Sequence, residues 1–147
     1  MWDPAPVPDM TVRNAATPAR VDVSRTSGIL LLGDLLAIGL FVLIGEIHHA
    51  GALSNVAVVS GALTFAEFAA GWLVAGLAVG AYAADALSSW HRAAVTTGGG
   101  WLLGASLGQV IRAVVEWGPV FPTFVLVTLG VGGAFLLGWR LVAAAWI

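Results

Sequence analysis

The residues of this sequence that could do chemistry are ionisable side chains inside long apolar runs. An acid or a base in a membrane span is costly, so it faces a partner, water or a functional site. Asp34 and Arg140 each lie about two helical turns inside an apolar run, one near each end of the chain. If both chain ends lie on the same side of a membrane, the depths of the two residues match. We therefore predict a buried Asp34–Arg140 ion pair in an inner polar layer, with Asp85 and Arg92 flanking the same surface.

A second set of polar residues lies where the apolar runs reach the opposite side. Arg112 and Glu116 are spaced as an i,i+4 ion pair at the end of one run, and Gln109 lies one turn deeper. Glu67 lies in the first turn of another run, where an acid complements the helix dipole. The outer charge cluster is predicted to consist of Glu46, His48, His49, Glu67 and Glu116. The residues predicted to be buried, and able to line a polar pathway, are Asp34, Gln109, Arg112 and Arg140.

Three interpretations of the outer charge cluster stay open at this point. Its residues could form structural ion pairs with their heads near the membrane surface. Its histidines and acids could relay protons near neutral pH. It could also hold a metal or a catalytic group, but Glu-x-His-His is not a zinc-binding spacing and no HExxH motif occurs. The sequence contains no cysteine, which excludes thiol chemistry and a thiolate metal site. It also contains no Walker motif, Rossmann fingerprint, nucleophile elbow or kinase signature, so we predict no metal, no cofactor and no catalytic residue.

Small residues recur at intervals of four in three of the apolar runs. Helices in lipid associate by close packing, which such small-xxx-small motifs permit. We predict that these residues pack the helices of one bundle together, and the alternative is a seam between two copies of the chain. The predicted packing residues are Gly76 and Gly80, then Gly100, Gly104 and Gly108, then Gly130, Ala134 and Gly138.

The composition places these residues in a membrane. Of the 147 residues, 59% are hydrophobic and only 10% are charged, and the mean hydropathy is +0.95. Globular proteins have a charged share of about a quarter, and a soluble domain of this size could not bury so much apolar surface. The net charge of −2 argues against a nucleic-acid partner. The lipid bilayer is the predicted partner, together with a homo-oligomer or another membrane protein.

The predicted architecture is an all-α integral membrane four-helix bundle. Residues 1–27 carry four prolines among small and charged residues and are predicted to be a disordered tail. Residues 28–147 form the transmembrane domain. Its four helices are predicted at about 28–47, 63–84, 97–115 and 121–145, each near the length of about 20 residues that a span requires.

The arginines predict the orientation of this multi-pass protein in the cell membrane. Arg13, Arg20 and Arg25 precede the first span, and Arg92 lies between the second and third. The loop at 51–62 contains neither lysine nor arginine. By the positive-inside rule, both termini and the Arg92 loop are cytoplasmic.

With these residues in view, the chain resembles a family of small membrane proteins catalogued as domain of unknown function "three-zero-five-four", found in haloarchaea and actinobacteria. The resemblance covers Leu31 to Arg140 and implies a compact four-helix membrane protein without supplying an activity. It rests on Asp34, Gly45, His49, Phe68, Gly71-Trp72, Arg112, Phe124-Val125-Leu126-Val127 and Gly138-Trp139-Arg140. Many relatives carry a basic residue where this chain has Glu46.

Three functions remain as hypotheses. The glycine motifs favour a non-enzymatic accessory or self-assembling membrane component. The alternative is a small homo-oligomeric transporter or a proton or ion pathway, which Asp34, Arg140 and the outer charge cluster would serve. The second alternative is a membrane enzyme or metal site that uses the outer histidines and glutamates.

Overall fold

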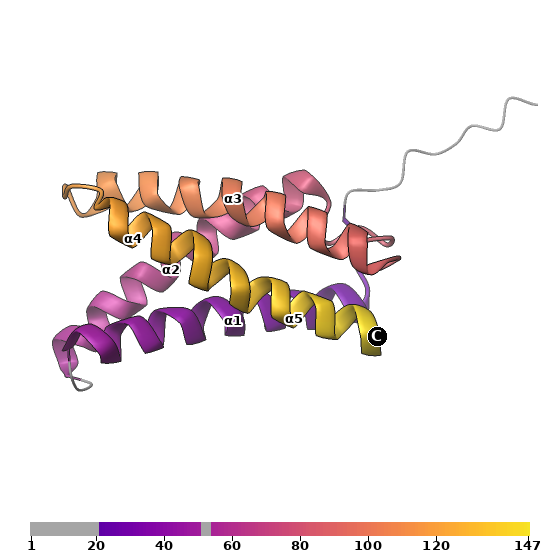
Figure 1. The fold of residues 1–147 in the computed structure, drawn as a ribbon, viewed down its shortest axis with the longest axis horizontal. Coiled ribbons are helices and arrows are strands. Elements are labelled where there is room, and N and C mark those ends of the chain that lie inside the picture. The colour runs from indigo at the N-terminus through magenta and orange to yellow at the C-terminus, as the bar shows by residue number, and fades with distance from the viewer. Residues whose placement is uncertain (1–20, 51–53) are drawn as a thin grey trace, which may run out of the picture.

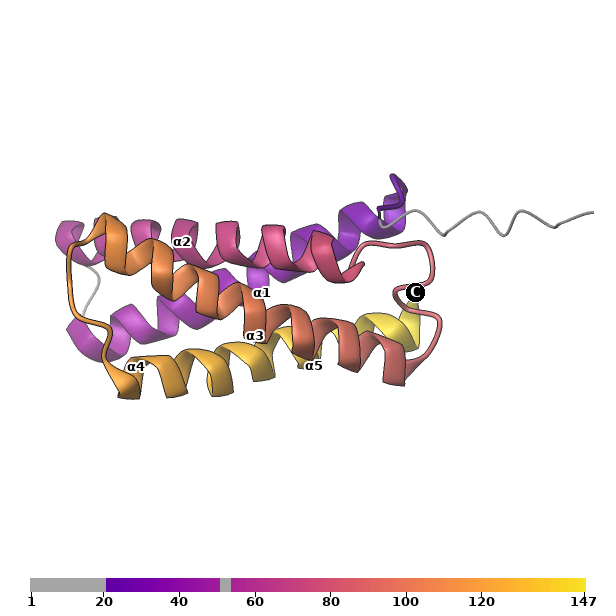
Figure 2. The ribbon, with the colours of Figure 1, turned by 90° about the horizontal axis from the view of Figure 1, so that it is seen from above.

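The fold is a bundle of four antiparallel helical rods. The computed structural model describes residues 21–50 and 54–147. The rods are α1 (Arg25–Ala50), α2 (Asn55–Val79), α3 (Trp90–Val115) and a fourth formed by α4 (Pro122–Val127), a π-helical turn η1 (Thr128–Gly132) and α5 (Gly133–Trp146). They lie side by side, and both ends of the described chain lie at the same end of the bundle (Figures 1 and 2). The described chain is therefore all helical apart from its connections, as predicted.

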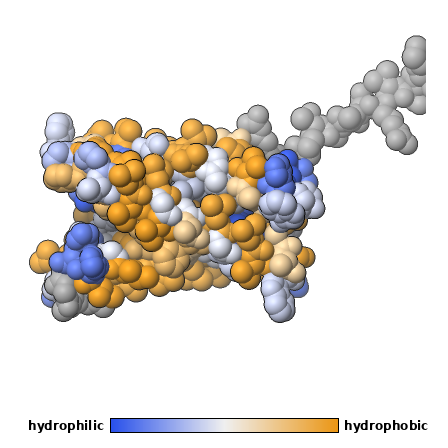
Figure 3. All heavy atoms as spheres, in the orientation of Figure 1, coloured by the Kyte–Doolittle hydropathy of each residue, from blue (hydrophilic) through white to orange (hydrophobic). Residues whose placement is uncertain are grey.

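Three of the four rods are long and apolar enough to cross a membrane: α1, α2 and the α4–α5 rod. The surface in Figure 3 is hydrophobic over the middle of the bundle and hydrophilic at its two ends. α3 has the same length as α1. Glycines, threonines, Gln109 and Arg112 lower the hydropathy of α3. The rod that contains the predicted span at 97–115 is therefore less apolar than the other three rods.

The predicted bounds of the second helix were wrong at both ends. α2 begins at Asn55, because the Ser54 side chain caps the helix by accepting a hydrogen bond from the Ala57 backbone N–H. Most of the predicted loop at 51–62 is thus helical. α2 ends at Val79, because Gly80 adopts the left-handed conformation at φ 75° and its N–H bonds back to the carbonyls of Gly76 and Leu77.

The other predicted bounds also move. α1 runs from Arg25 to Ala50, so residues 25–27 of the predicted tail are helical. α3 begins at Trp90 rather than 97, because the Ser89 side chain accepts a hydrogen bond from the Arg92 N–H. The tail prediction for residues 1–20 lies outside the described residues. Just before α1, the Asp22 N–H donates to the Tyr82 carbonyl over 2.8 Å.

The glycines of α3 bring its backbone against that of α2. A Cβ atom added to Gly71 would collide with the Gly104 carbonyl oxygen, and one added to Gly104 would lie 2.9 Å from the Cα of Trp72. Gly108 packs in the same way against Phe68, and Gly100 packs against Trp72. The Gly100–Gly104–Gly108 motif therefore lies inside the bundle and is not free to form a seam with another copy.

The other two predicted motifs do not join helices of the bundle. Gly76 faces the side chains of Trp72 and Tyr82, and Gly80 is the helix cap. Gly130, Ala134 and Gly138, which we call the outward stripe, lie on the exposed surface of the fourth rod. A Cβ atom added to Gly130 or Gly138 would meet nothing within 4 Å. The prediction that these residues pack the bundle was wrong, and the adjacent Gly132 and Gly133 contact Trp101 in their place.

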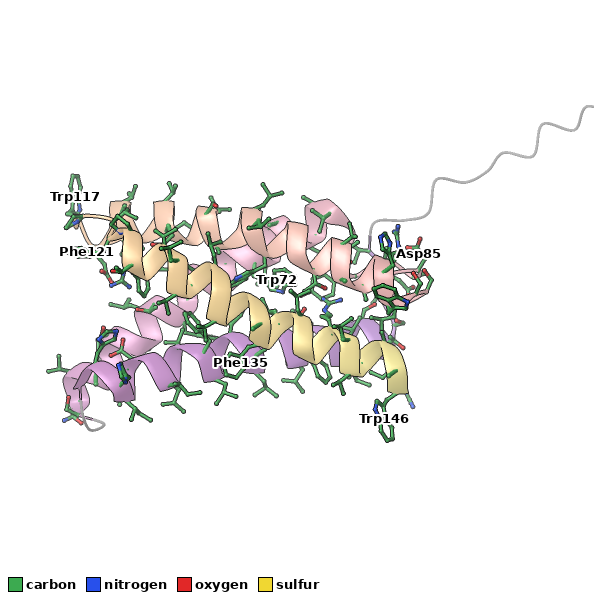
Figure 4. The ribbon with its side chains drawn as sticks, viewed as in Figure 1. Trp72, Asp85, Trp117, Phe121, Phe135 and Trp146 are labelled. Carbon is green, nitrogen blue, oxygen red and sulfur yellow. The ribbon has the colours of Figure 1, made fainter. Side chains whose placement is uncertain are left out.

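The core lies along the axis of the bundle and is rich in large aromatic side chains. Phe68, Trp72 and Trp101 are buried there, with ring centroids about 6.3 Å apart for both the Phe68–Trp101 and the Trp72–Trp101 pairs. Figure 4 shows Trp72 near the middle of the bundle, whereas Trp117 and Trp146 lie at opposite ends. The exposed tryptophans at the ends fit the aromatic belts of a membrane protein.

Candidate functional site

The inner polar layer is centred on Asp34 of α1 and Arg140 of α5. The Arg140 Nε donates to Asp34 Oδ1 over 2.8 Å, and the terminal Nη2 donates to Oδ2 over 2.6 Å. This is a two-point ion pair, and the side chains are 0% and 1% exposed. The structure thus brings together the two residues whose matching depths suggested a pair.

Three further groups complete this inner network, which we define as Asp34, Trp72, Ala81, Tyr82 and Arg140. The Tyr82 hydroxyl donates to Asp34 Oδ2 over 2.6 Å, and the Trp72 indole N–H lies 3.1 Å from the same oxygen and 2.9 Å from the Tyr82 oxygen. Arg140 Nη1 donates to the Ala81 carbonyl over 2.6 Å. The guanidinium also lies over the Tyr82 ring, 5.0 Å from its centroid.

The chemistry of the inner network is that of a closed structural contact. Both Asp34 oxygens and all three Arg140 nitrogens have partners. Burial, followed by the charge of Asp34, raises the pKa of Tyr82, so its phenol keeps the proton that it donates. The network connects α1, α2, the α2–α3 connection and α5.

Substituting Tyr82 with phenylalanine tests how much the hydroxyl contributes. A hydrogen bond to a charged group contributes about 1.5–3 kcal/mol, so we expect the free energy of unfolding to fall by that amount. Unfolding in mixed micelles, followed by circular dichroism, measures it. Thr96→Ala is the matched control, because the Thr96 hydroxyl donates to a backbone carbonyl of its own helix in a half-buried position. Equal losses for the two variants would contradict the assigned role of Tyr82.

At the opposite end of the bundle, Arg112 joins α3 to α2. Its Nη1 donates to Thr64 Oγ1 over 2.8 Å and lies 3.4 Å from Glu67 Oε2. Its Nη2 lies 2.8 Å from Glu116 Oε2. The guanidinium also stacks over the Phe124 ring, 5.1 Å from the centroid. The Arg112 guanidinium therefore contacts two carboxylates and one hydroxyl.

The predicted outer charge cluster divides into two groups in the structure. Glu67 and Glu116 gather around Arg112, and we call these three residues with Thr64 the Arg112 cluster. Glu46 lies in the other group, where it accepts a hydrogen bond from Ser60 over 3.3 Å. His48 and His49 are exposed, with their rings 5.6 Å apart and edge to face. Within residues 21–50 and 54–147, no group of three or more acids or histidines is arranged to hold a metal ion.

Gln109 of α3 lies between the two polar regions and faces the π-helical turn of the fourth rod. Its amide nitrogen lies 3.5 Å from the Thr128 hydroxyl, and the Trp101 indole N–H donates to the Thr128 carbonyl over 3.1 Å. A π-turn leaves a backbone carbonyl available for such an outside donor.

At the end of the bundle nearer the inner network, Arg92 and Asp85 form a half-exposed ion pair at 2.9 Å.

Sequence reasoning missed the neutral partners of both groups. Tyr82 is the one tyrosine of the chain, and it lies just after the glycine that ends α2. A search for buried hydroxyl and indole donors at the depth of Asp34 would have suggested it. Ser60 was missed because the start of α2 was placed too late, which left it in a predicted loop. Thr64 lay inside the predicted helix, but a threonine near a helix start carries no signal that it will meet an arginine of another helix.

Comparison with known proteins identifies a family but no described function. The family described as "Protein of unknown function (DUF3054)" has a sequence model that matches residues 31–143. This match replaces the bounds expected from resemblance, which ended at Arg140. It supplies no haloarchaeal or actinobacterial source, so that part of the expectation is not carried further. No curated protein and no solved structure matches the chain significantly.

Proposed function

Because the chain belongs to this family of unknown function, its role has to come from its geometry, and we propose that it is a non-enzymatic membrane component that works as a homo-oligomer. The observation that carries the proposal is the outward stripe. Gly130 and Gly138 are exposed on an apolar membrane-spanning rod, with nothing within 4 Å of either added Cβ position. Small residues that approach nothing in their own chain leave room for the backbone of a second helix.

The interior of the bundle supports a structural role. The inner network has closed its hydrogen bonds within the chain. α2 and α3 touch at backbone level where Gly71 meets Gly104. Such packing stabilises one arrangement of the helices and leaves assembly to the outer faces.

An apolar groove runs beside the outward stripe and extends the surface available to a second copy. It lies between α1 and α5, has a volume of about 430 Å³, and its lining includes Ile29, Leu32, Leu36, Leu40, Phe135 and Trp139. In an assembly, side chains that flank the stripe of a second copy insert into this groove. Close van der Waals packing of this kind drives helix association in membranes.

The decisive experiment measures the number of copies in lipid nanodiscs by native mass spectrometry. We expect the wild-type protein to be a dimer or a larger assembly. The double variant Gly130→Leu, Gly138→Leu should associate at least about tenfold more weakly, which corresponds to ~1.4 kcal/mol. A Cβ atom at either position meets nothing within 4 Å, so the fold itself is expected to tolerate the substitution.

Gly99→Leu provides the matched control. Gly99 is also an exposed helical glycine with nothing within 4 Å of the added Cβ, but it lies on α3. This variant should assemble like the wild type. A monomeric wild-type protein, or a double variant that assembles as well as Gly99→Leu, would remove the basis of the proposal.

A further inference from the structure

Glu67 is a buried carboxyl group whose hydrogen bonds are incomplete. Its side chain is 4% exposed and lies within the membrane-spanning helix α2. No donor among the described residues reaches its Oε1 atom. Its Oε2 lies 3.4 Å from Arg112 Nη1, longer than a typical charge-assisted hydrogen bond of about 2.7–2.9 Å. An ionised carboxylate left in this state is costly to bury.

Glu116, the second carboxylate of the Arg112 cluster, makes the shorter ion pair with the guanidinium. Glu116 lies 2.8 Å from Arg112 Nη2 and is partly exposed, so water also stabilises its charge. Two ionised acids around one arginine give the cluster a net charge of −1. A proton on Glu67 brings that charge to zero and supplies a donor at the carboxyl group.

We propose that Glu67 is a proton-binding site, which holds a proton while Arg112 is paired with Glu116 and gives it up when Arg112 turns to Glu67. A proton from water forms an O–H bond at the Glu67 carboxyl, and its release returns it to water on the side where Glu116 is exposed. Protonation of Glu67 is thereby coupled to the ion pairing of Arg112, which bonds Glu116 when the proton is bound and Glu67 when it is released. This inference is independent of the proposed assembly, because it concerns α2 and α3 and not the outward stripe.

The groups facing Glu67 favour a proton over a metal cation as the ligand. α3 contributes Arg112, whose positive charge repels a metal ion, as well as Glu116. α4 contributes the ring of Phe124, which lies under the guanidinium. On α1, the acid at this end, Glu46, is bonded to Ser60. Among the described residues, no group of three or more acids or histidines is arranged to hold a metal ion.

Infrared spectroscopy of the full protein in lipid nanodiscs tests the site directly, with the proton as the probe. A protonated buried carboxyl group gives a C=O stretching band that shifts in D₂O. We expect this band in the wild type at neutral pH, and its loss as the pH rises. Glu67→Gln, which keeps the shape of the side chain, should lose the band.

Two further variants keep the test specific. Glu46→Gln removes an acid at the same end of the bundle that is not in the Arg112 cluster, so it should retain the band. Glu116→Gln leaves Arg112 to Glu67, so the band should disappear at a lower pH than in the wild type, and this readout remains if Glu67→Gln does not fold. A wild-type protein without the band down to mildly acidic pH, or a Glu67→Gln protein that retains it, would overturn the proposal.

Discussion

Replacing Arg140 with glutamine is expected to lower the free energy of unfolding by about 3–5 kcal/mol, the largest effect of any single substitution considered. The loss of one partner leaves the buried Asp34 carboxylate without its countercharge, and an uncompensated buried charge costs about that much. Arg140 also bonds the Ala81 carbonyl, so the α2–α3 connection loses a contact as well. Equilibrium unfolding in mixed micelles, followed by circular dichroism, measures the change.

A double variant separates the cost of the unpaired charge from the contribution of the pair. Asp34→Asn with Arg140→Gln removes both charges, and we expect it to be more stable than Arg140→Gln alone, because no unpaired ion remains. Arg92→Gln is the control for loss of an arginine. Its partner Asp85 and Arg92 itself are 43% and 40% exposed, and such surface pairs contribute about 0–1 kcal/mol. If Arg140→Gln cost no more than Arg92→Gln, the inner network would not hold the bundle together.

The second large effect is expected at the contact between α2 and α3. Gly71→Ala adds a methyl group where the Gly104 carbonyl oxygen lies, so the two helices must separate. Overpacking of this kind costs about 1–3 kcal/mol, and the loss of helix contacts along the rest of the interface adds to it. We expect the variant to unfold at lower denaturant. Its tryptophan fluorescence should also change, because Gly104 moves away from Trp72.

Gly98→Ala makes the same chemical change where there is space. Gly98 lies on α3 with nothing within 4 Å of the added Cβ. Alanine is favoured over glycine in a helix by about 1 kcal/mol, so this variant should match the wild type or exceed it in stability. A Gly71→Ala protein as stable as Gly98→Ala would mean that the backbone contact is not required.

The sequence was informative about the fold wherever one physical constraint acted alone. Apolar runs long enough for a bilayer predicted the helical rods, and the matching depths of Asp34 and Arg140 suggested their pairing. Boundaries were predicted less well, because the caps at Ser54 and Ser89 lie in stretches that also resemble loops. The Gly100–Gly104–Gly108 motif and the outward stripe look alike in sequence, yet one is buried and the other exposed. Spacing identifies a face that permits close approach but not the neighbour that approaches it.

The candidate sites show the same limit at the level of single atoms. The polar types and depths of Glu67, Arg112 and Glu116 could be read from the sequence. The sharing of Arg112 between two acids depends on the rotation of α2 against α3, which the contact between Gly71 and Gly104 sets. Glu46 and the histidines lie at a similar depth, but Glu46 pairs with Ser60 of α2.

The ion pair between Asp34 and Arg140 spans 106 residues of sequence, and this separation matters while the protein is being made. Chains grow at about 5–20 residues per second, so roughly 5–20 s pass between synthesis of the acid and synthesis of its arginine. During that interval Asp34 lacks the arginine with which it pairs in the folded bundle. Asp34 must therefore remain near water or be sheltered by the insertion machinery until the last helix arrives. Final closure of the bundle is therefore a late event in biogenesis, and a nascent chain that stops before α5 has no means of neutralising Asp34 in this way.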